Sequence, residues 1–240
     1  MRYYANPSTP AAREAMSAGL LGFIDTPAQG NVRPPGIDWC ADNGCFGKGY
    51  PGDEAWLAWL TAQVALDGAT CAFATAPDVV GDAQATLARS APWLPTIRAL
   101  GVPAAYVAQN GATVGNLPWA DFDVLFLGGT VECPEHGARL DAEREGTGSA
   151  TRHYCPVCRR RIYDWKLGPV PRQLVAEAKR RGMRTHMGRV NTGKRYAYAA
   201  AIGCDSADGT TLAKFPNTLP LVLGWVKDHH ANPPLFGDIA

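Results

Sequence analysis

Short apolar runs alternate with amphipathic segments along most of the chain, and this alternation is the feature that most limits the possible folds. Strands that alternate with helices across short connections are typical of a parallel sheet covered by helices. The pattern predicts strands over 2–5, 20–24, 37–41, 71–74, 104–108, 124–127, 184–187 and 202–205. It predicts helices over 11–18, from 53 onward, and over 82–100, 170–181, 194–201 and about 219–229.

The number of strands indicates how the sheet is arranged. Seven or eight strands in about 200 residues favour a compact eight-fold barrel over an open sheet. An open dinucleotide-binding sheet would carry a glycine-rich fingerprint after its first strand, and none follows residues 2–5. We therefore expect an α/β fold, a compact TIM-like (β/α)8 barrel.

The polar, glycine-rich segment 131–164 interrupts the alternation. A chain of 240 residues with 46% hydrophobic residues suits one domain with a sizeable core. We expect residues 1–130 to form the first part of the barrel, 131–164 an insert and 165–240 the remainder. No apolar run approaches the roughly 20 residues of a membrane span, and residues 1–7 lack a signal pattern. The default expectation is a cytoplasmic protein, in the host cytoplasm if a phage encodes it.

Polar residues and glycines follow the predicted strands at their C-terminal ends. In a parallel barrel these ends share one face, where such barrels place their active sites. Any single residue of this kind is more often a helix cap or a turn residue, but several together favour a shared site. They are Asp42, Asp78, Gln109, Gly128, Gly129, His186, Asp205 and Asp208.

Charge is unequally distributed between the two parts of the chain. Residues 1–130 carry 6 Lys/Arg against 11 Asp/Glu, a net charge of −5, whereas residues 131–240 carry 17 against 11, a net charge of +6. This asymmetry fits a site that uses carboxylates and holds a polyanion beside them. The alternative is that the arginines lie on solvated helix faces, and charge alone slightly favours that alternative.

The segment 131–164 also contains the spacing of a metal site: C-x2-H, then 18 residues, then C-x2-C. Four such ligands close a tetrahedral structural zinc site with no open position for a catalytic water. His153 is an alternative fourth ligand, and free thiols in a loop are the alternative to a metal. Because this polar segment could not form a core alone, we expect zinc to hold it. The expected ligands are Cys133, His136, Cys155 and Cys158.

Three arginines, Arg159, Arg160 and Arg161, directly follow the last expected zinc ligand. A loop that is held by a metal ion and carries three arginines suits contacts with nucleic-acid phosphates. Because the insert follows a predicted strand end, we expect it to project from the active-site face. This projection would place the three arginines beside the predicted site, where they could bind phosphates.

Four short motifs together resemble the tRNA-guanine transglycosylases. Asp42-Asn43-Gly44-Cys45-Phe46 resembles their Asp-Ser-Gly-Gly-Phe turn, and Gly203-Cys204-Asp205-Ser206-Ala207-Asp208 resembles their Gly-x-Asp-x-x-Asp turn. His186-Met187-Gly188 and Gly128-Gly129 resemble the family's apolar-Met-Gly strand end and Gly-Gly loop. The short length and Trp165-Lys166-Leu167-Gly168-Pro169 look closer to the phage and bacterial 7-deazaguanine DNA transglycosylases.

The resemblance implies a barrel enzyme that removes guanine from a polynucleotide and inserts a 7-deazaguanine base, such as 7-cyano-7-deazaguanine. It implies that Asp208 is the nucleophile on C1′ of the sugar and that Asp42 is the general acid and base. It implies DNA as the polymer, with tRNA as the alternative. The residues it implies for substrate binding are Asp78, Gln109, Gly128, Gly129, His186 and, in a supporting role, Asp205.

The chemistry is also reasonable from the residues alone. A breaking glycosidic bond develops oxocarbenium charge, which a nearby carboxylate stabilises or captures. A second carboxylate is needed to move protons on the ring nitrogens, and a third suits the N1–H and amino group of guanine. The target base must also leave its stack before a site at a barrel mouth can reach it.

Several alternatives stay open at this point. Ala207 replaces an aromatic residue common in the family's turn, so Asp205 competes with Asp208 as the nucleophile. The family's tRNA enzymes carry zinc ligands after the barrel, so the zinc prediction rests on spacing alone. A zinc-stabilised nucleic-acid-binding barrel without catalysis also fits, as does a deoxyribosyltransferase acting on free nucleosides.

Overall fold

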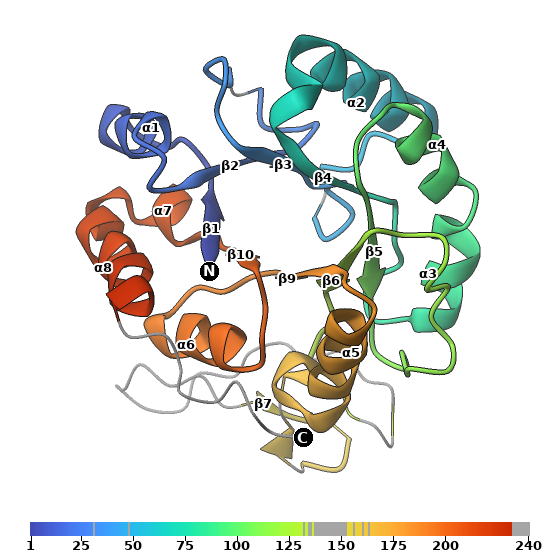
Figure 1. Ribbon diagram of the computed structural model, residues 1–240. Helices are drawn as coiled ribbons and strands as arrows, with labels where there is room; N and C mark the ends of the chain where they lie inside the picture. Colours follow the sequence, from blue (N-terminus) through green and yellow to red (C-terminus); the bar gives the residue numbers. More distant parts are fainter. Residues whose placement is uncertain are drawn as a thin grey trace.

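The computed structural model describes residues 1–30, 32–47, 49–131, 133, 136, 153–155, 157–159, 161–162 and 164–231. At its centre, eight parallel strands close into a barrel in the order β1-β10-β9-β6-β5-β4-β3-β2 (Figure 1). The predicted (β/α)8 barrel is therefore confirmed. The strands are β1 (Arg2–Ala5), β2 (Gly22–Asp25), β3 (Trp39–Ala41), β4 (Cys71–Thr75), β5 (Ala104–Ala108), β6 (Val124–Leu127), β9 (Arg184–Met187) and β10 (Ser206–Asp208).

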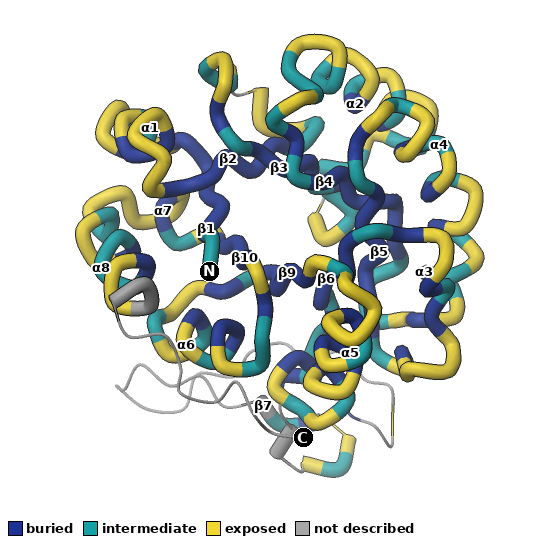
Figure 2. The backbone as a smooth tube through the Cα atoms, in the orientation of Figure 1, coloured by how far each residue is buried: buried dark blue, intermediate teal, exposed yellow. Residues whose placement is uncertain are grey.

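Helices surround the barrel and turn their buried sides toward the strands (Figure 2). Strand side chains alternate between two apolar layers, one inside the barrel and one beneath the helices. Tyr4, Phe73 and Phe126 belong to the inner layer, whereas Trp56 and Leu60 pack in the outer one. The helices are α1 (Pro10–Ser17), α2 (Asp53–Asp67), α3 (Ala83–Ser90), α4 (Trp93–Ala99), α5 (Pro169–Arg180), α6 (Gly193–Ala201), α7 (Thr211–Lys214) and α8 (Leu219–Ala231), with short 3-10 helices η1 (Gly68–Thr70), η2 (Trp165–Leu167) and η3 (Pro216–Thr218).

The helix predicted over 82–100 is in fact two helices. The side chain of Asp82 caps α3 by accepting a hydrogen bond from the N–H of Ala85 at 2.9 Å. Pro92 has no N–H to donate and its ring clashes with the preceding helical turn, so α3 ends at Ser90 and α4 begins at Trp93. The end of α3 contacts the residues that follow β4, because the hydroxyl of Ser90 donates to the carbonyl of Pro77 at 2.8 Å.

The strand predicted over 202–205 is wrong, and this error matters for the site. Helix α6 ends at Ala201, and Gly203 follows with φ +96°, so these residues form the turn after the helix. Strand β10 begins only at Ser206. Asp205 therefore precedes the strand and Asp208 ends it, which places the two carboxylates at opposite mouths of the barrel.

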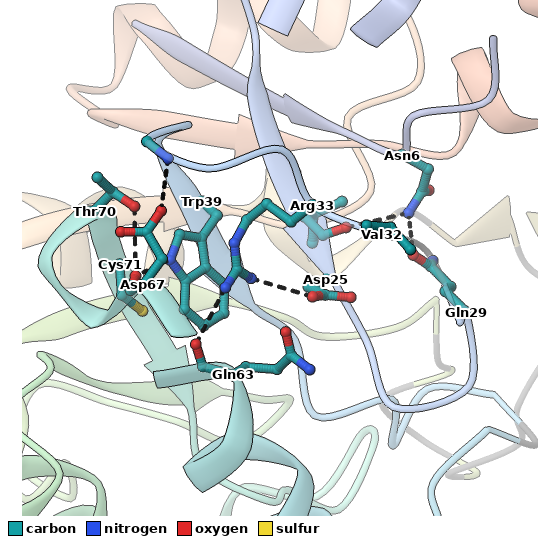
Figure 3. Close-up of polar contacts among 12 residues, drawn as sticks. Asn6, Asp25, Gln29, Val32, Arg33, Trp39, Gln63, Asp67, Thr70 and Cys71 are labelled. Carbon is teal, nitrogen blue, oxygen red and sulfur yellow. Dashed lines mark hydrogen bonds and ion pairs between the residues drawn. The ribbon is translucent and has the colours of Figure 1, made fainter. Parts of the chain in front are cut away.

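The connection between β2 and β3 contains no helix among its described residues, and a buried ion pair holds it instead (Figure 3). The Arg33 guanidinium lies 3.3 Å from Asp25, and each side chain is only 4% exposed. It also lies 3.6 Å from the ring centroid of Trp39 and donates to the carbonyl of Gln63 at 3.2 Å. This single side chain thus links the connection to β2, β3 and α2.

Asp67, at the end of α2, fixes the same connection from its other side (Figure 3). Its carboxylate accepts the N–H of Gly36 at 2.9 Å, and its carbonyl accepts the indole N–H of Trp39 at 2.8 Å. Farther along, a Cβ added to Gly49 would lie 2.8 Å from that of Ala28, so the connection packs closely against the loop that follows β3. That loop begins with Asp42, so the connection supports one side of the site.

The insert leaves the barrel just after β6 and returns just before η2. Val131 and Asp164 pair in an isolated antiparallel bridge, so the chain leaves and returns at neighbouring points. Strands β7 (His153–Tyr154) and β8 (Arg161–Ile162) form a small antiparallel sheet within it. No helix in the described part of the chain is long and apolar enough to cross a membrane.

Candidate active site

A pocket opens at the C-terminal ends of the barrel strands. Six of the residues predicted from the sequence line it together: Asp42, Asp78, Gln109, Gly128, Gly129 and Asp208. The sequence prediction did not include its other lining residues, which are Asn43, Phe46, Thr75, Val80, Val107, Phe126, Gly188 and Arg189.

Asp78, just after β4, is held by two side-chain amides. Asn43 donates to one carboxylate oxygen at 2.8 Å, and Gln109 donates to the other at 2.6 Å. The carbonyl oxygen of Gln109 accepts the N–H groups of Gly81 and Gly129, both at 2.9 Å, which sets the orientation of its amide. Burial raises the pKa of Asp78, and the two amide donors oppose that rise. The network leaves a fixed acceptor group on the pocket wall.

Asp208, the last residue of β10, is positioned from two sides. His186 Nε2 lies 2.9 Å from one carboxylate oxygen, and its Nδ1 lies 2.8 Å from the hydroxyl of Ser206. An N–H at Nε2 can donate to the carboxylate of Asp208, while Nδ1 shares a hydrogen bond with the hydroxyl of Ser206. The backbone N–H of Arg189 donates to the other carboxylate oxygen at 3.2 Å. Asp208 thus faces the pocket with a defined orientation.

Asp42, just after β3, lies in an environment that disfavours its charge. Burial raises its pKa to about 7, and the neighbouring Asp208 carboxylate adds to the rise. The N–H of Gly44 donates to Asp42 at 3.0 Å, and this hydrogen bond opposes the rise in pKa. A carboxyl group with a pKa near neutrality can both give and take a proton at physiological pH.

Arg189 is a pocket residue that follows the β9 strand end. Its φ of 58° is unusual for a residue with a side chain, and this conformation directs its N–H toward Asp208. Its guanidinium donates to the carbonyl of Gly129 and lies 4.1 Å from the ring centroid of Phe46. Arg189 therefore joins three loops around the pocket mouth.

A buried lysine supports the same turn from beneath. Lys166 is 1% exposed, and its Nζ donates to the carbonyl of Gly188 at 2.6 Å. Burial lowers the pKa of Lys166 to about 7, opposed chiefly by the nearby carboxylate of Asp164. A Cβ at Gly188 would lie 2.7 Å from the Phe126 ring, so the turn packs too closely for a larger residue. The position of Lys166 between Trp165 and Leu167 in the sequence gave no sign of this burial.

Two predicted substrate-binding residues lie elsewhere. Asp205 lines a separate cavity, with Arg2 and Arg184, at the N-terminal ends of the strands. There it forms an ion pair with Lys179 and accepts the N–H of Thr185, so its carboxylate has a structural role. His186 is 0% exposed and lies within β9, behind Asp208. It contacts the carboxylate rather than the pocket.

The four expected metal ligands come together as predicted. Ligand atoms of Cys133, His136, Cys155 and Cys158 all lie within 4.8 Å of one another. The sulfurs of Cys133 and Cys158 are 3.9 Å apart, close to the roughly 3.8 Å expected in a tetrahedron with Zn–S bonds of about 2.3 Å. His136 Nδ1 lies 3.5 Å from Cys133 Sγ and 3.7 Å from Cys155 Sγ. This cluster could hold a metal ion.

The three arginines predicted to contact phosphates are only partly described. Arg159 is exposed and has a φ of 57°. The backbone of Arg161 lies in β8, whereas Arg160 and the side chain of Arg161 lie outside the described residues. Their contact with nucleic acid stays a prediction.

No protein-family model matches the chain, and no curated protein matches it. The resemblance to the transglycosylases therefore stays a prediction from the motifs. A (β/α)8 barrel supports many unrelated chemistries, so its presence does not identify a reaction. The argument for function depends on the side chains of the pocket.

Proposed function

We propose that this protein is a base-exchange transglycosylase that replaces guanine in DNA with a 7-deazaguanine base. One observation carries the proposal: Asp42, Asp78 and Asp208, from three different strand ends, line a single pocket. Their surroundings differ, and the differences match three distinct tasks at a glycosidic bond. The pocket also excludes Asp205, which was the competing nucleophile.

Asp208 suits the role of nucleophile. One of its oxygens forms a bond to C1′ of the sugar as the bond from C1′ to guanine N9 breaks, and the bonding pair leaves with the base. The His186 ring and the N–H of Arg189 orient the carboxylate of Asp208. Both contacts come from behind or beside Asp208, which leaves its pocket side open to the sugar.

Asp42 suits the transfer of protons to and from the two bases. In its protonated form it gives a proton to the departing guanine and becomes a carboxylate. That carboxylate then takes the N9 proton of the entering 7-deazaguanine, whose nitrogen attacks C1′ and releases Asp208. A pKa of about 7 makes both forms accessible, and the protons balance over one exchange.

Asp78 suits recognition of the guanine edge. Guanine presents an N1–H and an amino group, both donors, and a carboxylate is the side chain that only accepts. Asn43 and Gln109 each use one lone pair of Asp78, and a carboxylate has about four acceptor positions. Two acceptor positions therefore remain for the base. 7-Deazaguanines keep the same edge, so one pocket serves both the departing and the entering base.

The basic part of the chain supports a polyanionic partner, and the choice of DNA over tRNA rests on the motif resemblance. Residues 131–240 carry a net charge of +6, and Arg159 is exposed beside the metal cluster. We assign zinc to Cys133, His136, Cys155 and Cys158, which would hold it in a structural site that takes no part in the reaction. Bound thiolates persist in a reducing compartment, so we place the enzyme in the cytoplasm, whether of its own cell or of a phage host.

Exchange of labelled guanine into DNA tests the proposal. Incubation with radiolabelled guanine and double-stranded DNA should make the DNA radioactive, and Asp208→Asn should reduce the rate by about 10³-fold or more. Asp205→Asn is the matched control, because it makes the same change at the other mouth of the barrel. A denaturant-stable enzyme–DNA adduct should form with the wild type and be absent from Asp208→Asn.

The outcomes separate the alternatives. Label that enters tRNA but not DNA would overturn the choice of polymer and keep the reaction. Full exchange by Asp208→Asn together with loss in Asp205→Asn would reverse the two roles. If the wild type binds DNA but exchanges neither guanine nor a 7-deazaguanine base, the result would favour a non-catalytic nucleic-acid-binding barrel.

A further inference from the structure

The hydroxyl group of Thr75 is buried on the pocket wall and has no hydrogen-bond partner among the described residues. Thr75 is 1% exposed, and its side chain lines the pocket. Among the residues that the structure describes, it is the only pocket-lining side chain with a buried polar atom that makes no hydrogen bond. Buried polar groups are almost always paired, so an unpaired one in a pocket is a candidate contact for a molecule that binds there.

The strand pattern places this hydroxyl on an otherwise apolar floor. Thr75 lies two residues after Phe73 on β4, so both side chains point into the barrel. Val107 and Phe126, from the adjacent strands β5 and β6, point inward and line the same pocket. Beside these apolar side chains, Thr75 supplies a group that can both donate and accept a hydrogen bond.

A valine would suit this position better if packing were the only requirement. It has nearly the same shape as threonine, favours strands equally well, and would place a methyl group beside Val107 and Phe126. The threonine instead leaves a polar atom unpaired in the free protein, which is unfavourable. Such unfavourable groups concentrate where a bound molecule later satisfies them.

We infer that the Thr75 hydroxyl is a specificity contact for the bound base, forming a hydrogen bond to a polar atom of a guanine-like heterocycle on the pocket floor. This inference rests on the proposed function. Thr75 ends the strand that leads directly to Asp78, so the two residues approach the base from the same wall. Asp78 reads the donor edge of the ring, and Thr75 reads a second polar atom.

Thr75→Val separates two effects of the hydroxyl. One is the unfavourable free energy of an unpaired polar atom in the free protein, and the other is the hydrogen bond to the base in the complex. In the free protein the change removes an unpaired polar atom, so the melting temperature should stay the same or rise. In the complex it leaves a polar atom of the base buried and unpaired, so the Kd for guanine should rise by about 5- to 150-fold. Thr75→Ser keeps the hydroxyl and should bind guanine within about threefold of the wild type.

Isothermal titration of the zinc-loaded protein with guanine and with 7-deazaguanine provides the measurement. A loss of affinity for guanine alone assigns the contact to N7, and a loss for both bases assigns it to another atom; both results support the inference. An unchanged Kd for both bases in Thr75→Val would overturn it. A fall in melting temperature together with equal loss in Thr75→Ser would also overturn it, because that result indicates a packing role.

The same titration tests the proposed function separately. Asp78→Asn should abolish guanine binding in a pocket that otherwise folds normally. If the wild type binds neither base, the proposed function fails, and the inference fails with it. If the wild type binds guanine and Asp78→Asn does not, while Thr75→Val binds normally, only the inference fails.

Discussion

Replacing Asp42 by Asn should alter the pH dependence of stability as well as abolish exchange. Burial and Asp208 raise the pKa of Asp42 from an ordinary value of 3.8 to about 7 in the folded protein. Between these pH values the folded state binds more protons than the unfolded state, so the free energy of unfolding falls as pH rises. The free-energy penalty of ionising Asp42 in the folded protein is fully present above about pH 7 and absent below about pH 4.

The size of the effect follows from the change in pKa. A rise from 3.8 to about 7 corresponds to about 4 kcal/mol, at 1.36 kcal/mol for each pKa unit. Because Asp42 lines an open pocket, water screens part of this penalty, and we expect about 2–4 kcal/mol. Asn keeps the oxygen that accepts the N–H of Gly44 but cannot ionise, so the variant escapes the penalty.

Urea unfolding between about pH 4.5 and about pH 8.5 measures this difference. The stability of Asp42→Asn minus that of the wild type should increase by about 1–3 kcal/mol over this range, because part of the penalty is already present at about pH 4.5, and should level off above about pH 7. Asp121→Asn, at an exposed position, makes the same chemical change away from the pocket and is the control. A constant difference for Asp42→Asn would refute the assignment of a raised pKa, and with it the proton-transfer role.

Two further predictions concern other parts of the molecule. Arg33→Met should destabilise the fold by about 3–5 kcal/mol near pH 8, because it leaves Asp25 buried and unpaired. Since burial raises the pKa of Asp25 to about 6, this loss should shrink below that pH in denaturant titrations; a pH-independent loss would contradict the ion-pair explanation. Native mass spectrometry should find one zinc ion per chain, absent from Cys158→Ser, and chelation should open the insert to proteolysis while the barrel stays intact. A metal-free protein with a protease-resistant insert would contradict the zinc assignment.

Much of the site was predictable because parallel strands bring their C-terminal ends to one rim. Asp42, Asp78 and Gln109 each directly follow a strand whose apolar run is easy to recognise. This relation depends only on strand direction, so errors of a residue or two at strand starts do not affect it. The spacing of the four metal ligands was predictive for a similar reason, since it restricts the local geometry of each pair.

The errors arose where local sequence is ambiguous. Residues 202–205 resemble a strand because they follow a helix and begin with an apolar side chain, but they form the turn that ends α6. This displacement placed Asp205 at the wrong mouth of the barrel. The sequence does not fix the register of a strand, and the register decides whether a residue points into the barrel or lies at the strand end. The role of His186 therefore could not be predicted.

The supporting residues were not predictable from a single sequence. A lysine normally indicates an exposed side chain, and the burial of Lys166 follows from the packing of η2 against the turn after β9. Arg189 likewise acquires its role through contacts with Phe46 and Gly129, from two distant loops. Such contacts exist only in the assembled barrel.

The barrel closes where its first strand meets its last, and Tyr4 of β1 pairs in register with Asp208 of β10. The hydroxyl of Tyr3 donates to the carbonyl of Val190, joining positions 187 apart in the sequence. During synthesis on the ribosome, β10, which carries Asp208, emerges last of the eight barrel strands, and its neighbour β1 emerges first. A growing chain therefore holds Asp42 and Asp78 before it holds the complete carboxylate set. The proposed cleavage of a glycosidic bond thus becomes possible only after the last barrel strand has been made.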